Sequence, residues 1–123
     1  MDNLAEQKYR AFFAVPPQVQ LLDLSGPAHV FYEAKCLNPA VSSYFISLEG
    51  NRTVESCAGL SLANLQDFND FELGPSDWLI IPGLESEVFF EPDFFQKIQA
   101  FLDWVKIQAE RGAKVCSVCT GTF

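Results

Sequence analysis

The sequence predicts an incomplete α/β domain whose central sheet is parallel and covered by helices on both faces. The composition is globular, since 49% of the 123 residues are hydrophobic and 20% are charged. Short apolar runs without clean alternation are separated by helical patterns, which is typical of strands buried on both faces. The final run, residues 115–118, is followed only by a turn. We therefore expect one partial domain over residues 1–123, its remainder lying elsewhere.

The first half of the chain shows a strand, a helix and a second strand. Residues 9–15 (YRAFFAV) form a compact apolar run closed by two prolines, which indicates a buried strand. Ser25 is a suitable N-cap and Pro27 a suitable first-turn residue, so we expect a helix over residues 27–36. Residues 44–48 form the second strand.

The middle of the chain predicts a small excursion before a third strand. Residues 53–57 and 60–62 alternate around a glycine, which favours a hairpin. Residues 64–75 form a polar and aromatic connection with room for a helical turn. Residues 78–81 are apolar throughout and end at Pro82, so we expect a central strand there.

The clearest helix begins at Pro92 and Asp93 and ends before Gly112. The helical spacing of its apolar residues predicts one buried face. That predicted face consists of Phe94, Ile98, Phe101, Leu102, Val105 and Ala109.

Charge and cysteine content limit the classes of function. The net charge is −8 and the isoelectric point about 4.4, whereas nucleic-acid binding depends on basic side chains, so we expect no DNA contact from this domain. No apolar run is long enough to span a membrane, and the first residues do not resemble an export signal. A cytoplasmic location is therefore expected, with Cys36, Cys57, Cys116 and Cys119 as reduced thiols.

Three loops far apart in the sequence should meet in such a fold. Asp23, Gly83 and Cys119 each follow a predicted strand. Ligand sites of open parallel sheets lie beyond the carboxyl ends of the strands. We therefore expect these three residues at one edge of the sheet.

Cys119 is the strongest candidate for chemistry. A cysteine directly after a buried strand, followed by small residues, is typical of a nucleophile elbow, with the Thr120 N–H facing an oxyanion. A following helix would point its N-terminus at the sulfur and favour the thiolate. Asp23 could accept a hydrogen bond from the thiol or act as an acid or base. The alternatives are a buried structural cysteine and a turn-forming carboxylate.

Other motifs carry weaker indications. Cys116 and Cys119 form a C-x-x-C, but a zinc site would need a second ligand pair at a recognisable spacing, so no metal or other cofactor is expected. His29 is the single histidine, and we interpret it as a surface or packed residue of the first helix. Phe89 and Phe90 could be exposed and serve a dimer contact.

Four collinear segments resemble the ThiJ/PfpI family of the class I glutamine-amidotransferase-like superfamily. They are residues 21–27 (LLDLSGP), 54–62 (VESCAGLSL), 77–83 (DWLIIPG) and 112–123 (GAKVCSVCTGTF). The resemblance covers nearly the whole chain. It implies a flavodoxin-like parallel sheet.

The resemblance also implies roles for individual residues. Cys119 matches the elbow cysteine of the family, and Asp23 matches the acidic residue that contacts it. Gly83 or Leu84, together with Thr120, match backbone donors around a ligand pocket. Leu84 stands where the related hydratases tend to have a second glycine.

Two branches of the family are similar to this sequence. The N-terminal effector domains of AraC-type transcriptional regulators are one, and isonitrile hydratase-like enzymes are the other. The first implies a homodimer that senses a small molecule and contacts DNA through a separate C-terminal domain. The second implies an enzyme of the hydratase or amidase kind that uses Cys119 and Asp23. A redox-responsive thiol at Cys119 is a third reading.

Overall fold

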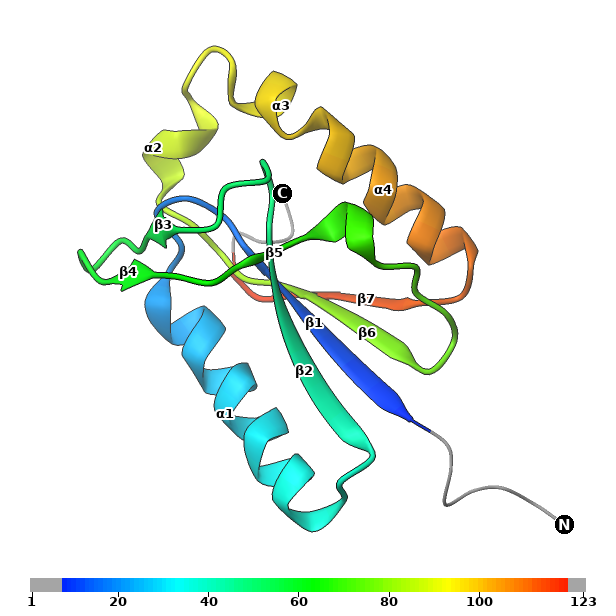
Figure 1. Ribbon diagram of the computed structural model, residues 1–123. Helices are drawn as coiled ribbons and strands as arrows, with labels where there is room; N and C mark the ends of the chain where they lie inside the picture. Colours follow the sequence, from blue (N-terminus) through cyan, green and yellow to red (C-terminus); the bar gives the residue numbers. More distant parts are fainter. Residues whose placement is uncertain (1–7, 120–123) are drawn as a thin grey trace, which may run out of the picture.

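A parallel sheet forms the centre of the computed structural model, which describes residues 8–119. Within this range the sheet has five strands in the order β5-β2-β1-β6-β7, and every neighbouring pair is parallel. Figure 1 shows the strands running side by side, with both ends of the chain drawn in grey. Its strands are β1 (Tyr9–Val15), β2 (Val41–Ser47), β5 (Gln66–Asp67), β6 (Asp77–Ile81) and β7 (Lys114–Ser117).

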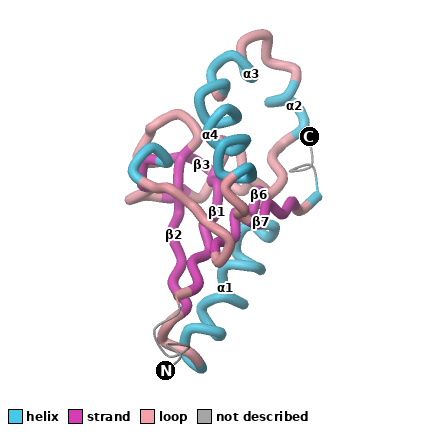
Figure 2. Tube along the Cα trace, turned by 90° about the vertical axis from the view of Figure 1, so that its right-hand side faces the viewer, coloured by secondary structure: helices cyan, strands magenta, loops and turns pink. Residues whose placement is uncertain are grey.

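Helices cover the two faces of this sheet. On one face lies α1, and on the other lie the C-terminal helices, as Figures 1 and 2 show. The helices are α1 (Leu21–Leu37), α2 (Ser86–Phe89), α3 (Phe94–Lys97) and α4 (Gln99–Glu110). The predicted fold class, a flavodoxin-like parallel sheet between helices, is thereby confirmed.

Strand β1 divides the apolar core into two clusters. Ala11, Phe13 and Val15 point to the α1 face, whereas Phe12 and Ala14 point to the α4 face. All five side chains are at most 1% exposed. Successive residues of a strand point to opposite faces, so a strand covered on both sides must be apolar throughout. This is why the YRAFFAV segment shows no alternation.

The prediction for the first helix was wrong at its start. Helix α1 begins at Leu21, six residues before the predicted Pro27, which instead lies in its interior. Ser25 is not its N-cap, because Gln20 holds that position. The physical reason is tertiary: Leu24 is 5% exposed and packs in the cluster beside β1, which fixes the first turn as helix despite the proline.

The single long helix predicted before Gly112 is divided at Ile98 into α3 and α4. A further short helix, α2, precedes them and was not predicted. The predicted buried face was partly wrong. Phe94, Ile98 and Phe101 are buried, but Leu102 is 38% exposed and Ala109 is exposed as well. The place of Leu102 is taken by Trp104, which is 7% exposed.

Polar contacts decide which face of α4 is buried. Trp104 Nε1 donates to the Phe71 carbonyl at 3.1 Å, and Gln108 Oε1 accepts from the Leu73 N–H at 2.7 Å. Gln108 is only 3% exposed, so its amide satisfies a backbone donor inside the core. The sequence spacing allows either stripe, and these bonds select the one containing Trp104.

The smaller elements follow the predicted pattern closely. Strands β3 (Val54–Glu55) and β4 (Ser61–Leu62) form the expected hairpin. The predicted connection contains the short edge strand β5 and a 3-10 turn, Phe68–Asp70. Strand β2 begins three residues earlier than predicted, since its first residues pair with those of β1.

Strand β7 is paired on one side only within residues 8–119. Val115 is 42% exposed, in contrast to the buried apolar residues of β1. Among the described residues, no helix combines the length and hydropathy that a membrane crossing needs.

The end of α4 leads to the first testable prediction. The Gly112 N–H donates to the Ala109 carbonyl at 3.0 Å, and the Ala113 N–H donates to Gln108 at 3.1 Å, which together form a Schellman motif. Gly112 has φ +100°, and an added Cβ would lie 3.1 Å from Pro75. Gly112→Ala should therefore lower the free energy of unfolding by about 1–2 kcal/mol in urea titrations.

The matched control is Gly74→Ala. Gly74 lacks a positive φ and has open space around its Cα, so this change should shift the free energy of unfolding by less than about 0.5 kcal/mol. Equal losses from both variants would contradict the proposed role of the left-handed conformation.

A buried hydroxyl gives a second prediction. Ser47 is 1% exposed, and its Oγ has no hydrogen-bond partner within the described part of the chain. An unpaired buried hydroxyl costs free energy, so Ser47→Ala should raise the free energy of unfolding by up to about 1 kcal/mol. Ser56 is equally buried, but its Oγ accepts from the N–H groups of Ala58 and Leu60. Ser56→Ala should therefore destabilise, and destabilisation by Ser47→Ala would overturn the prediction.

Candidate functional site

Three loops meet at the carboxyl edge of the sheet. They follow β1, β6 and β7, which are consecutive neighbours in the sheet order. Parallel strands end at the same edge, so segments more than thirty residues apart are brought side by side. Gly83 and Cys119 lie in the segments after β6 and β7, and Asp23 lies just past the loop after β1. These are the three residues that the sequence placed after strands.

Asp23 connects two of these loops. It lies in the first turn of α1, not in the preceding loop as the sequence indicated. Its Oδ2 accepts a hydrogen bond from the Gly83 N–H at 3.3 Å. A carboxylate in the first turn of a helix is also favoured by the helix dipole. The early start of α1 is therefore what positions Asp23 over the end of β6.

Backbone hydrogen bonds fix the loop between β1 and α1. The Gln20 N–H donates to the Gly83 carbonyl at 2.8 Å, and Val19 forms bridges with both Ser56 and Leu84. Gly83 and Leu84 are themselves buried. The Gly83 N–H is thus bonded to Asp23, so a ligand that used this donor would compete with that carboxylate.

Cys119 follows β7 in an unusual conformation. Its φ is +54°, a left-handed value that costs a residue with a side chain about 1–2 kcal/mol. The preceding Val118 N–H donates to the Ile81 carbonyl at 3.0 Å, which extends the pairing of β7 with β6. The thiol is exposed. Strained backbone that presents an accessible nucleophile is characteristic of functional sites.

The described part of the chain does not show the contacts that were predicted between Cys119 and its partners. Within residues 8–119, Asp23 accepts its hydrogen bond from Gly83, and Cys119 makes none. The pairing of the thiol with Asp23 therefore stays a prediction. Thr120, predicted as an oxyanion donor, lies outside the described residues. The roles of Gly83 and Leu84 in ligand binding also stay predictions.

Two further polar residues lie near this edge. The Cys57 thiol donates to Gln20 Oε1 at 3.6 Å, and the Cys57 N–H donates to the Val19 carbonyl at 3.0 Å. Cys57 thus joins the hairpin to the loop that precedes α1. Sequence reasoning missed Gln20, since only the true start of α1 shows it to be the N-cap.

The other candidate groups do not join the site. His29 lies on the surface of α1, where its Nε2 is 3.2 Å from Glu33, as expected for a surface histidine. Cys116 packs against the cluster beneath α1. No group of His, Cys, Asp or Glu in the described range is arranged to hold a metal ion.

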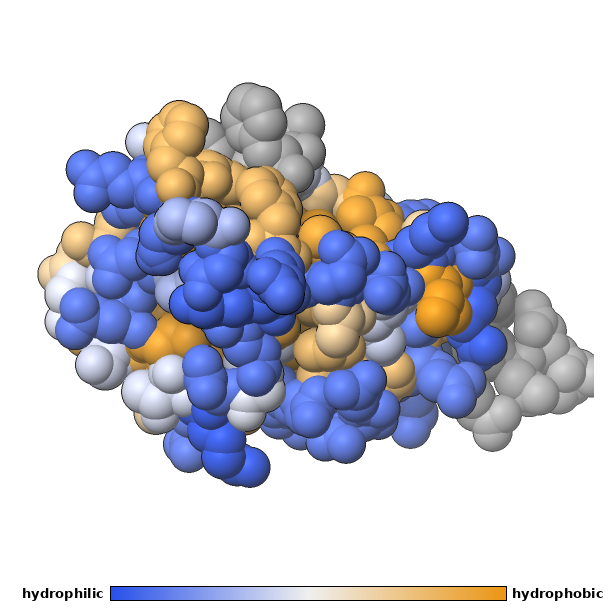
Figure 3. All heavy atoms as spheres, turned by 90° about the horizontal axis from the view of Figure 1, so that it is seen from above, coloured by the Kyte–Doolittle hydropathy of each residue, from blue (hydrophilic) through white to orange (hydrophobic). Residues whose placement is uncertain are grey.

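The phenylalanines near α2 and α3 form a partly exposed aromatic cluster. Phe94 is 4% exposed, and its ring contacts Phe89 and Phe95 at centroid distances of 5.8 and 5.2 Å. Phe90 is 83% exposed. From above, hydrophobic side chains gather in patches between hydrophilic ones (Figure 3).

A separate pocket of about 580 Å³ lies beside the first turns of α1. It is bounded by α1, β1, β2 and the segment of residues 60–65. None of Asp23, Gly83 and Cys119 lines it. The structure therefore has a candidate site at the carboxyl edge and a separate apolar pocket.

The parallel sheet between helices makes this domain an α/β protein of the flavodoxin-like class. At the carboxyl edge of the sheet lies an exposed cysteine whose backbone has a left-handed conformation. A family model, described as the DJ-1/PfpI family, matches residues 9–123. The chain belongs to the DJ-1/PfpI family. No curated protein matches the sequence closely enough to count as a relative.

Solved structures share this fold at low sequence identity. An AraC family transcriptional regulator from Pseudomonas putida is 19% identical, with a TM-score of 0.72, covering 93% of this chain and 57% of its own. A candidate transcriptional regulator from Vibrio parahaemolyticus is 18% identical, with a TM-score of 0.76 and coverages of 94% and 58%. DJ-1beta of Drosophila melanogaster is 12% identical, with a TM-score of 0.71 and coverages of 94% and 57%. The chain thus spans less than two thirds of these proteins.

Thiol accessibility gives a prediction for the site. Cys36 and Cys119 are exposed, whereas Cys57 and Cys116 are half-buried. Iodoacetamide should modify the two exposed thiols several times faster than the other two, because alkylation requires access to the sulfur. Timed quenching followed by peptide mass spectrometry measures the four rates. Modification of Cys57 as rapid as that of Cys36 would contradict the described packing of the hairpin.

Proposed function

We propose that this domain senses a small molecule and belongs to an AraC-type transcriptional regulator. Residues 1–123 would then be part of a DJ-1/PfpI domain. A separate C-terminal domain would bind DNA. The observation that carries the proposal is the carboxyl edge, where Asp23 bonds the Gly83 N–H while Cys119 is held exposed beside the same sheet edge. A ligand bound there would touch loops from three strands.

The net charge and the solved structures of the same fold support this assignment. A net charge of −8 suits a domain that leaves phosphate contacts to another part of the protein. Two of the solved structures with the same fold are described as transcriptional regulators. The four free thiols suit a reducing cytoplasm. The exposed Phe90 is an apolar surface that a homodimer could bury.

The second candidate is an enzyme of the hydratase or amidase kind. The left-handed conformation of Cys119 favours it, since a nucleophile elbow presents its side chain in this way. In an amidase, the Cys119 thiolate would add to the amide carbon, the C–N bond would break, and Asp23 would pass a proton to the leaving amine. Water would then hydrolyse the thioester and release Cys119. The two functions make opposite predictions for turnover.

The experiment uses the full-length protein and its own upstream DNA. A panel of nitrogen-containing metabolites is screened by thermal shift, and a ligand at 100 times its Kd should add about 2.7 kcal/mol of stability. Asp23→Ala and Cys119→Ala should lose this stabilisation and any ligand effect on DNA binding. Basal DNA binding in a mobility-shift assay should persist, because these residues lie in the sensing domain.

The matched control is Cys36→Ala, an exposed cysteine at the far end of α1, which should respond like the unaltered protein. A protein without DNA affinity that turns over isonitriles, and loses turnover in both site variants, would overturn the regulator proposal in favour of the enzyme. A parent gene encoding a single DJ-1/PfpI domain would also count against the regulator.

A further inference from the structure

We propose that the pocket beside α1 binds an uncharged, apolar small molecule. The volume of about 580 Å³ falls within the roughly 300–1,000 Å³ typical of small-molecule sites. The pocket is separate from the Asp23 and Gly83 contact. This second site adds to the proposed function and does not rest on it.

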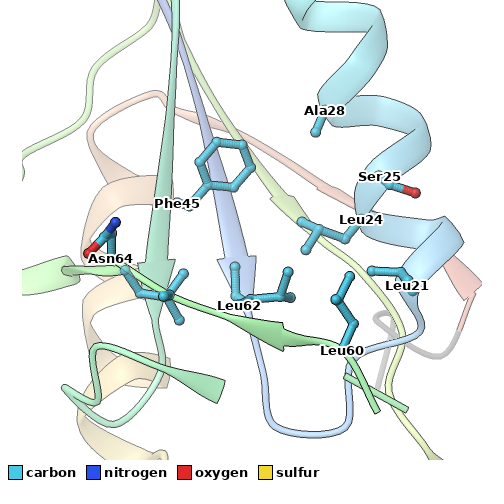
Figure 4. A pocket seen from close by; sticks show the side chains of 11 residues that line it. Leu21, Leu24, Ser25, Ala28, Phe45, Leu60, Leu62 and Asn64 are labelled. Atoms are coloured by element: carbon cyan, nitrogen blue, oxygen red, sulfur yellow. The ribbon is translucent and has the colours of Figure 1, made fainter. Parts of the chain in front are cut away.

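One wall of the pocket is a single face of α1. Leu21, Leu24 and Ala28 follow the i, i+3, i+7 spacing, which places them in one row along the helix. Opposite them stand Phe45 of β2 and Val15 of β1. In Figure 4, Phe45 faces the helix across the space that the α1 side chains border. The α1 row and the sheet therefore form two facing apolar walls.

The segment of residues 60–65 forms the remaining wall. Leu60 and Leu62 line the pocket from β4 and its approach, and Leu65 follows them. Leu65 is 3% exposed, but Leu60 is 54% exposed. Covering a half-exposed leucine with apolar ligand atoms removes hydrocarbon surface from water, which favours binding.

The polarity of the lining selects the chemistry of the ligand. Among the described residues that line the pocket, none carries a charge, and Ser25 and Asn64 are the only polar ones. In Figure 4, the Ser25 hydroxyl and the Asn64 amide lie at the periphery, beyond the leucine side chains. A charged ligand would lose its hydration without an opposite charge to replace it. The site therefore favours a neutral aromatic or branched aliphatic molecule.

The shape favours a small molecule over a protein partner. Val15 and Leu24 are at most 5% exposed, so the floor is packed and fixed. The volume of the recess, about 580 Å³, is that of a site for one small molecule. A concave pocket with a packed floor therefore suits a single small-molecule ligand.

The test is a fluorescence titration of the full-length protein with N-phenyl-1-naphthylamine, a neutral aromatic probe. We expect saturable binding of one probe per chain, at least tenfold tighter than the sulfonated analogue. Leu60→Gln should weaken binding at least tenfold, because it places an amide in the apolar wall. Ala28→Phe should do the same by filling the space.

The matched controls are Leu102→Gln and Ala109→Phe, at exposed positions of α4 on the other face of the sheet. Both should bind the probe like the unaltered protein. Because Leu60 is largely exposed, Leu60→Gln keeps the test valid even where Ala28→Phe fails to fold. The proposal would be overturned if the probe showed no saturable binding, or if Leu60→Gln bound the probe with unchanged affinity. It would also be overturned if probe binding were lost when the protein self-associates.

Discussion

The burial of β1 on both faces is the constraint on which this structure depends. The strand pairs with β2 on one side and β6 on the other, and its side chains alternate between the two core clusters. A strand in that position needs helices above and below it. The path of the chain into and out of β1 then determines where the carboxyl edge lies and which loops reach it.

The loop after β1 holds together the segments of the candidate site. Val19 bridges both Ser56 and Leu84, and the Gln20 N–H bonds to the Gly83 carbonyl. The hairpin and the end of β6 are therefore held by one short loop. Because α1 begins immediately afterwards, Asp23 is placed against the Gly83 N–H, and the row of Leu21 and Leu24 is placed over the apolar pocket.

At the opposite edge of the sheet, a polar network also joins separate segments of the chain. Arg10 donates to both carboxylate oxygens of Asp77, at 3.0 and 2.8 Å, and its Nη2 donates to the Glu72 carbonyl. The hydrogen bonds that Arg10 donates to Asp77 raise the pKa of the Arg10 guanidinium above its usual value. Asp77 also accepts from the Gly74 N–H. The starts of β1 and β6 and the chain before β6 are thus joined by one carboxylate.

The sequence by itself determined the fold class and the order of the central strands and of the helices on the two faces, but not the short helix α2 or the division between α3 and α4. Apolar runs such as residues 9–15 identify buried parallel strands, and the rule of carboxyl edges brings Asp23, Gly83 and Cys119 together, because both depend on local composition and chain order. The start of α1 and the buried stripe of α4 were decided by tertiary structure. Packing of Leu24 outweighs the helix-breaking tendency of Pro27, and the bonds of Gln108 select one of two equally spaced stripes. The apolar pocket joins four segments that share no sequence motif, so only their packing could place it.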